Sequence, residues 1–507
     1  AMLMHPMTTS DLFFLLQQLG LPADLKPELS QLFDAIDAGH TALQLDRASE
    51  ESWSRALNQN DLSQLLAVNH QFLQIRRHSA QEKRVALELR RRALTRINPA
   101  PIDPLHFMPH ADSSQQAAIV GAAARTLAVV SGGPGTGKTT TAAAIVAAKL
   151  KILGKIPRIS LVAPTGKAAV RLTESFQAAC SNMDQPDARL NDVVATTIHR
   201  QLNTLSESQV VLIDEASMVS LDLFDRLLKA LSPDAHIILM GDPNQLASVE
   251  AGNILKTISD SESLNSHCFT LTNRHRIQGQ ETLATLQDLC LVGDSVGFLE
   301  CIRESGVFWE PNQSTDRLKT YLLHGLKPYL DRVKTAEQLE APAFQCLTAI
   351  HEGIGGRRFV NHLIQAECQQ LGLRGVGERL LVTENQPALG VFNGDIGVVV
   401  DSNDTQNPRV QFDTLSTPLM RNQLGWVEPA WAISIHRSQG SEYQSVLVCL
   451  PEPSSNGSRF RPSRELLYTA LTRAKQSVGL FASERMLQSA LQQTIQRVTC
   501  LGYFLNE

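Results

Sequence analysis

The stretch Gly132–Thr140 constrains this chain more than any other, because its letters GGPGTGKTT fit the phosphate-binding loop pattern G-x-x-x-x-G-K-[ST]. The apolar run 126–130 before it predicts a buried strand, and the alanine-rich run 141–150 after it predicts a helix. A glycine-rich turn between a strand and a helix points several backbone N–H groups, and the positive end of the helix, at one phosphate. The chain is therefore predicted to bind a nucleoside triphosphate.

Within this loop, Lys138 is expected to reach the β- and γ-phosphates, and the hydroxyl of Thr139 is expected to ligate Mg²⁺. The predicted nucleotide contacts are Gly132, Gly133, Pro134, Gly135, Thr136, Gly137, Lys138, Thr139 and Thr140. The predicted cofactors are therefore ATP and Mg²⁺.

Length and composition narrow the class of protein. A chain of 507 residues is too long for one core, and roughly three domains are expected. The net charge of −5 neither favours nor excludes a nucleic-acid partner, because a local basic groove suffices. The 8 cysteines are scattered without a C-x-x-C pair, which indicates reduced thiols and a cytoplasmic location. No apolar run reaches the roughly 18 residues of a membrane helix, so no membrane association is expected.

The first part of the chain, residues 1–98, is predicted to be a helical domain. Apolar residues recur at helical spacing over 29–36 and again over 61–75. Residues 76–96 carry eight basic side chains against Glu82 and Glu88. Such a run is typical of a solvated helix face, a nucleic-acid contact or a partner contact, and the pattern leaves all three open. A proline-rich linker, 99–114, follows.

From residue 115 onward, apolar strands repeatedly end in polar residues. The strands over 158–163, 210–213 and 236–240 lead into Pro164–Lys167, Asp214–Ser217 and Gly241–Gln245. In an open parallel sheet, ligands bind beyond the carboxyl ends of the strands. These polar loops are therefore expected to converge on the phosphate loop, in a first motor domain over 115–270.

The second half repeats this scheme over 271–507, with strands expected at 344–349 and 431–435. The second of these strands leads into His436–Glu442. Residues 375–429 differ, because they are short-stranded and rich in turn residues, and Asn393-Gly394 is a strong hairpin signal. The predicted fold is α/β, with two P-loop-type motor domains, a small β insertion in the second and a helical N-terminal domain.

Five residues outside the phosphate loop suit phosphoryl transfer. Asp214 would hold Mg²⁺, and Glu215 would polarise the attacking water, although an acidic pair after a strand can also simply cap the next helix. Gln245 would sense the γ-phosphate, although it could be an ordinary loop residue. An arginine finger adds about 10³–10⁵ in rate. Arg276 and Arg473 are the candidates, and the pattern alone does not distinguish either from a surface arginine.

The motifs occur in the order found in superfamily 1 helicases. Their wording, especially APTGKAA at 163–169, DEASM at 214–218 and HRSQGSE at 436–442, resembles the RecD family, the 5′→3′ motor subunits of the RecBCD exonuclease V complex. The resemblance covers about 115–280 and 340–485.

This resemblance implies two RecA-like domains with ATP between them and an SH3-like insertion. It implies that Gln115, rather than the rival Gln116, reads adenine, and that Glu442 contacts nucleotide and couples the domains. It also implies that Arg276 and Arg473 reach across to the phosphates. The single-strand track would be lined by Thr165, Lys167, Thr197, His199, Asn393 and His436.

The chain departs from the family pattern in three places. Asn244 and His275 stand where the family often has aspartate and tyrosine. Only about twenty residues, 176–195, separate two motifs where a strand-separating hairpin is sometimes inserted, so a large built-in pin is not expected. By position, the N-terminal domain resembles the part that docks on the RecC subunit.

The function predicted from sequence is an ATP-dependent 5′→3′ DNA helicase. It would be the motor subunit of a RecBCD-like complex that processes double-strand DNA ends for recombinational repair, with single-stranded DNA and RecB- and RecC-like subunits as partners. The alternatives are a free-standing 5′→3′ helicase, a structural subunit controlled by ATP, and a P-loop ATPase acting on protein or small molecules. No nuclease site is expected, because no further carboxylate-rich domain remains to hold catalytic metals.

Overall fold

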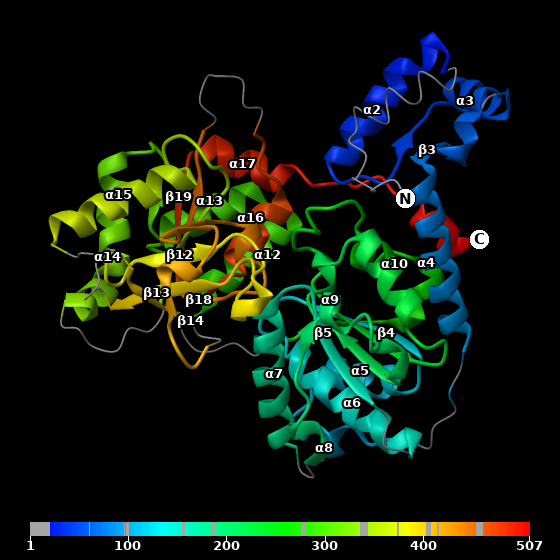
Figure 1. The fold of residues 1–507 in the computed structure, drawn as a ribbon, viewed down its shortest axis with the longest axis horizontal. Coiled ribbons are helices and arrows are strands. Elements are labelled where there is room, and N and C mark those ends of the chain that lie inside the picture. Colours follow the sequence, from blue (N-terminus) through cyan, green and yellow to red (C-terminus); the bar gives the residue numbers. More distant parts are fainter. Residues whose placement is uncertain are drawn as a thin grey trace.

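The structure is a computed structural model. It describes residues 21–59, 61–95, 97, 101–154, 158–183, 188–274, 280–334, 343–372, 375–401, 407–412, 415–452 and 460–507. Figure 1 shows two α/β bodies beside each other, with a small N-terminal part above the first of them. Two of the sheets formed by these residues are parallel and belong to the motor domains; the other two are antiparallel.

The first motor domain is a parallel sheet with strand order β6-β5-β7-β8-β4-β9. Its strands are β4 (Leu127–Gly132), β5 (Ile159–Ala163), β6 (Thr196–Thr197), β7 (Val210–Ile213), β8 (His236–Gly241) and β9 (Cys268–Leu271). One face is covered by α5 (Ser113–Ala123), α6 (Lys138–Leu153) and α7 (Gly166–Ser181). The other is covered by α10 (Leu221–Ala230) and α11 (Ile254–Ser259), while α8 (Ala188–Asn191) and α9 (Ile198–Gln201) are short. Burial on both faces explains why these strands are continuously apolar.

The second motor domain is built in the same way, with strand order β10-β19-β18-β11-β17. Its strands are β10 (Trp309–Glu310), β11 (Phe344–Thr348), β17 (Ala432–Ser434), β18 (Tyr443–Leu450) and β19 (Ala474–Ala482). Helices α12 (Glu281–Val292), α13 (Ser295–Glu304), α16 (Arg464–Leu471) and α17 (Glu484–Gln492) cover one face. Helices α14 (Thr315–Lys334) and α15 (Arg357–Gln370) cover the other. Two such domains confirm the predicted α/β fold class.

The insertion in the second domain is an antiparallel sheet with strand order β15-β14-β13-β12-β16. Its strands are β12 (Arg379–Val382), β13 (Ile396–Asp401), β14 (Arg409–Phe412), β15 (Leu419–Met420) and β16 (Val427–Pro429). The predicted turn lies between β12 and β13, where Gly394 has a φ of +98°. Beside it, the ring of Phe392 packs against the first domain, with its centroid 4.3 Å from the Arg200 guanidinium.

The N-terminal part contains α2 (Lys26–Asp37), α3 (Arg47–Gln59) and a sheet of order β1-β3-β2. The strands are β1 (Leu43–Gln44), β2 (Leu66–Asn69) and β3 (Phe72–Ile75). The helix predicted over 61–75 is therefore wrong. His70 adopts a left-handed φ of +53°, which turns the chain, and β2 and β3 pair antiparallel across that turn.

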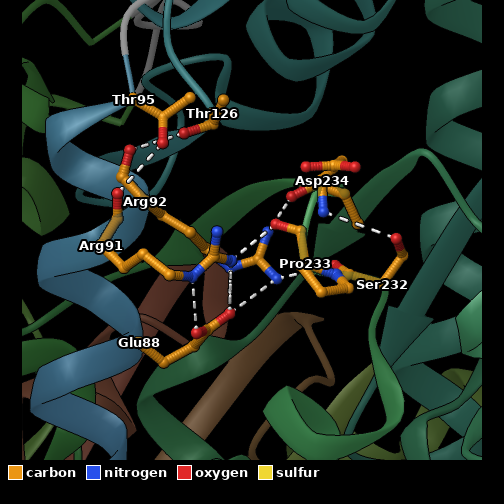
Figure 2. A network of polar contacts seen from close by, with 9 residues as sticks. Glu88, Arg91, Arg92, Thr95, Thr126, Ser232, Pro233 and Asp234 are labelled. Atoms are coloured by element: carbon orange, nitrogen blue, oxygen red, sulfur yellow. Dashed lines mark hydrogen bonds and ion pairs between the residues drawn. The ribbon is translucent and has the colours of Figure 1, made fainter.

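Helix α4 (Arg76–Leu94) carries most of the basic run and lies on the first motor domain, against α10. Arg84 donates to both carboxylate oxygens of Asp225, at 3.0 and 2.8 Å. Figure 2 shows Arg92 reaching into the turn before β8, where it donates to the backbone oxygens of Ser232 and Ala235. None of the three interpretations left open for the basic run describes Arg84 and Arg92, because both side chains contact the chain's own first domain.

The chain crosses back to the first domain after α17, through residues 493–500, which we call the return segment. Arg497 donates to the backbone oxygens of Ser248, Glu250 and Gly252 at 2.6–2.8 Å. Helix α18 (Leu501–Asn506) then packs on α4 (Figure 1). The second domain was expected to run to residue 507, but burial of apolar side chains such as Phe504 places its last residues on the first domain. None of the described helices is long and apolar enough to cross a membrane.

Candidate functional site

The phosphate loop opens onto a cavity of about 290 Å³ between the two motor domains. The first domain lines it with the loop, α7 and the ends of β7 and β8, and the second domain with the end of the 436–442 segment and Arg473. The lining residues are Pro134, Gly135, Thr136, Gly137, Lys138, Thr139, Thr140, Ala168, Arg171, Leu172, Ser175, Asp214, Glu215, Asp242, Gln245, Gly440, Glu442 and Arg473.

The loop needs its glycines for two physical reasons. Gly135 and Gly137 have φ values of +72° and +75°, which side chains rarely adopt, and Gly137 caps α6. A Cβ on Gly132 would stand 2.6 Å from the Thr136 hydroxyl oxygen. Lys138 Nζ donates to the carbonyl oxygens of Gly132 and Gly133 at 2.8 and 2.9 Å, so its ammonium lies over the curved backbone of the loop.

Three carboxylates follow the neighbouring strands β7 and β8 into the cavity. Burial and the adjacent Glu215 raise the pKa of the Asp214 carboxyl to about 7, against opposing effects of Lys138 and Arg171. Glu215 itself has a left-handed φ of +50°, an uncommon conformation that such sites often hold. Burial also raises the pKa of Asp242. Sequence reasoning did not assign Asp242 a role, although it directly follows a buried strand, as Asp214 does.

The donor set around Lys138 fits Mg²⁺. The Thr139 hydroxyl and the Asp214 and Asp242 carboxylates all line the cavity, and hard oxygen ligands are those that Mg²⁺ prefers. Among the described residues there is no cluster of three His, Cys, Asp or Glu that would hold a metal alone.

Arg473 and Gln245 come together across the domain boundary. The buried Arg473 guanidinium donates to Gln245 Oε1 at 3.1 Å and to the backbone oxygen of Ser441 at 3.0 Å. Nearby, the Tyr468 hydroxyl of the second domain donates to Asp242 Oδ2 at 2.9 Å. The structure therefore brings a cation and a hydroxyl of the second domain to the loops after β8.

Arg171 is a cavity residue that sequence reasoning missed. It projects from α7, pairs with Glu442 Oε2 at 2.6 Å and donates to the Gly440 oxygen at 3.1 Å. The only signal in the sequence is its position four residues after Lys167, a spacing that would put both side chains on one face of a helix.

The predicted finger Arg276 and the neighbouring His275 lie outside the described residues. A different arginine, Arg274, lies beside the phosphate loop, with its guanidinium 3.7 Å from where a Cβ on Gly133 would stand. It pairs with Asp288 of α12 at 2.7 Å.

Gln115 lies buried at the start of α5. Its side-chain oxygen accepts from the Asp112 N–H at 3.0 Å, and its amide donates to the Thr136 oxygen at 3.2 Å. The rival Gln116 instead donates to the Ala111 oxygen at 2.7 Å. Gln115 is thus the glutamine that contacts the phosphate loop, while adenine recognition stays a prediction.

The residues predicted to contact single-stranded DNA fall into two groups. Thr165 caps α7. Thr197 of β6 lies close to it, because Thr197 pairs with Ala163 of the parallel strand β5, two residues before Thr165. Lys167 lies over the Tyr443 ring at 5.7 Å, His199 is exposed, and the Phe392–Asn393 turn of the insertion packs nearby on Gly166 and Arg200. His436 lies apart from them, in a second cavity of about 790 Å³ that is lined also by Asn244 and Arg497.

Two parallel α/β domains, a phosphate loop with carboxylates at its side, and an arginine from the facing domain define a two-domain P-loop motor of the helicase class. Comparison with known proteins agrees. The AAA domain family matches residues 110–307, and the UvrD-like helicase C-terminal domain family matches residues 429–481.

Relatives cover most of the chain. The RecBCD enzyme subunit RecD of Mycobacterium tuberculosis (strain CDC 1551 / Oshkosh) is 34% identical, over 85% of this chain and 79% of its own. RecD of Mycolicibacterium smegmatis is 35% identical, over 76% and 74%. The ATP-dependent RecD2 DNA helicase of Deinococcus radiodurans is 30% identical, over 72% of this chain and 48% of its own. The chain belongs to the RecD family.

Proposed function

We propose that this chain is an ATP-dependent DNA helicase, the motor subunit of a RecBCD-type complex that moves 5′→3′ along a single strand. The observation that carries the proposal is the shared cavity. The first domain contributes the phosphate loop and carboxylates, and the second contributes Arg473 and Glu442. Because the cavity takes catalytic groups from both domains, the rate of hydrolysis depends on the relative position of the domains. A translocating motor requires this dependence.

Each cavity residue has a chemical task in this proposal. The loop N–H groups and Lys138 bind the phosphates of ATP. Thr139 and Asp214 would hold Mg²⁺, which would neutralise charge on the phosphate oxygens. Glu215 accepts the proton of the attacking water. Arg473 stabilises the charge that develops on the transferred phosphoryl group, and Gln245 holds the Arg473 guanidinium in place.

Arg276 and Gln115 complete the proposed nucleotide site. Arg276 would supply a second cation, and Gln115, at the start of α5, would read adenine. The strand would run past Thr165, Lys167, Thr197, His199, Asn393 and His436, and would be held mainly by its backbone, so binding should weaken steeply with salt.

The subunit form of the proposal is favoured over a free-standing helicase by how much of this chain each relative matches. The M. tuberculosis RecD is 34% identical over 85% of this chain, and the RecD2 helicase is 30% identical over 72%. RecB- and RecC-like subunits are therefore the proposed protein partners, and double-strand DNA ends the proposed substrate.

Steady-state ATPase with and without oligo-dT tests the proposal, first on the chain alone and then with RecB- and RecC-like subunits. Stimulation by oligo-dT that the Lys138→Gln variant lacks is expected, as is unwinding of a duplex with a 5′ tail but not of one with a 3′ tail. Absence of stimulation in every combination would overturn the helicase in favour of an ATP-controlled structural subunit. Unwinding from the 3′ tail would overturn the polarity alone.

A further inference from the structure

An ion pair joins the two motor domains inside the cavity. Arg171 of α7 donates to Glu442 Oε2 at 2.6 Å and to the Gly440 oxygen at 3.1 Å, so one side chain of the first domain holds the loop before β18 of the second. Both side chains line the nucleotide cavity. Their side chains are 38% and 27% exposed, so the contact can break and form without unpacking a core.

Arg171 and Glu442 each lie on a segment whose first residues are proposed to contact the DNA strand. On α7, Thr165 caps the helix and Lys167 stands four residues before Arg171, one helical turn away on the same face. On the second domain, His436 begins the short segment that ends at Glu442. Because α7 is a rigid element, a strand that fixes its first turn also fixes where Arg171 points.

The electrostatics keep this pair charged. Burial alone would raise the pKa of Glu442, but Arg171, Arg473 and Lys475 together lower it, so the carboxylate is ionised at neutral pH. The Arg171 guanidinium is also attracted by Glu215 and Asp214, which face it across the cavity. Arg171 therefore stands between the proposed hydrolytic carboxylates and the carboxylate of the facing domain.

We propose that the Arg171–Glu442 pair transmits strand binding to ATP hydrolysis. Arg171 acts as a positioning residue. A DNA strand that is held by the start of α7 and by the 436–442 segment keeps the ion pair between Arg171 and Glu442 formed. The paired loop then keeps Ser441, the backbone partner of Arg473, in place, and with it the contact between Arg473 and Gln245. This inference rests on the proposed function, since it concerns how DNA stimulates the ATPase.

A double-mutant cycle on the full chain tests the pair. The variants Arg171→Met and Glu442→Gln keep most of each side chain's volume, and Arg171→Lys keeps the charge. For each variant and for the double variant, kcat and the KM for ATP are measured with and without oligo-dT. Far-UV circular dichroism and thermal unfolding show that each variant is folded, because these readouts do not depend on the nucleotide cavity that both residues line.

Each single change is expected to lower the DNA stimulation of kcat by about tenfold, within the range of measured couplings between sites. The double variant is expected to lose no more than either single variant, because the same contact is removed. Arg171→Lys should retain part of the stimulation. Arg303→Met is the matched control, because Arg303 makes a comparable 2.8 Å pair with Glu484 inside the second domain.

The outcomes separate this inference from the proposed function. If the parent chain is stimulated and both single variants keep that stimulation, the coupling role is overturned alone. Losses that multiply in the double variant would also overturn it, since each side chain would then act independently on the nucleotide. A parent chain that oligo-dT stimulates neither alone nor with RecB- and RecC-like subunits would overturn the DNA-driven motor, and the coupling with it.

Discussion

The side chain of Arg473 occupies a position that a lysine cannot reproduce. Its guanidinium donates at once to Gln245 Oε1, to the Ser441 oxygen and to groups of its own helix turn. A lysine ammonium is a point charge without this planar fork.

Arg473→Lys is therefore expected to lower kcat by about a hundredfold or more, part of the effect of removing an arginine finger. The KM for ATP should change little, because the phosphate loop is untouched. Steady-state kinetics with saturating oligo-dT would measure both. An unchanged kcat would show that Arg473 only joins the two domains.

Asp214 gives the site a pH dependence of stability. Its pKa is raised from 3.8 to about 7 by burial and by Glu215, so the folded chain binds this proton more tightly than the unfolded chain does. The stability that the proton provides is complete below the unfolded pKa and is lost as the pH rises through about 7.

In EDTA and without nucleotide, Asp214→Asn is thus expected to raise the Tm relative to the parent more at about pH 8 than at about pH 5. Thermal unfolding at the two pH values measures the difference. The exposed Asp192→Asn should show no such trend. A Tm difference independent of pH would contradict the shifted pKa.

The site residues that could be predicted from the sequence are those that lie in a local motif or directly after a predicted strand. The phosphate loop, Asp214 and Gln245 each follow a strand, and the structure places them on one cavity. Arg171 and Tyr468 face that cavity or its edge only because two domains meet there. Both residues lie in or beside motifs quoted from the sequence, but a local motif does not show which residue of the other domain each side chain contacts.

At the scale of elements, α4 shows how a charged run can be structural. Its basic residues left a nucleic-acid or partner contact open, but Arg92 is buried and donates to two backbone oxygens of the first domain, whereas the exposed Arg91 pairs with Glu88 on the same helix (Figure 2). A charge pattern reports where cations stand along a helix. It does not report which face the rest of the fold covers.

Substitution of the two neighbouring arginines should lower the free energy of unfolding by very different amounts. Arg92→Met is expected to destabilise the chain by about 3 kcal/mol, because it leaves the carbonyl oxygens of Ser232 and Ala235 without their charged donor and removes one of the two arginines that pair with Glu88. Arg91→Met should cost about 1 kcal/mol or less, as exposed pairs do. Urea denaturation measures both values. Equal costs would mean that α4 is not docked through Arg92.

For the molecule as a whole, the return segment is the contact that sequence patterns did not suggest. Residues 493–500 carry no motif, yet Arg497 binds three backbone oxygens of the loop after β8, and Val498 pairs with Thr41 of the N-terminal part. The segment therefore holds three parts of the chain together.

Arg497→Ala is expected to lower the free energy of unfolding by about 3 kcal/mol, since three carbonyls lose a charged donor. The radius of gyration from small-angle scattering should also rise as the domains part. Arg485→Ala, an exposed change on α17, is the control. A compact variant of parental stability would show that the segment lies passively on the surface.

The return segment also fixes how the molecule can move. Two stretches of the chain join the motor domains: the one that lies in sequence between Leu271 of β9 and Glu281 of α12, and residues 493–500. Two connections between the domains define one rotation axis, whereas a single connection would allow rotation about several axes. Rotation about that axis is the easy motion, and sliding or twisting of one domain across the other is resisted. Whatever work the chain extracts from ATP is therefore delivered along a single angular coordinate.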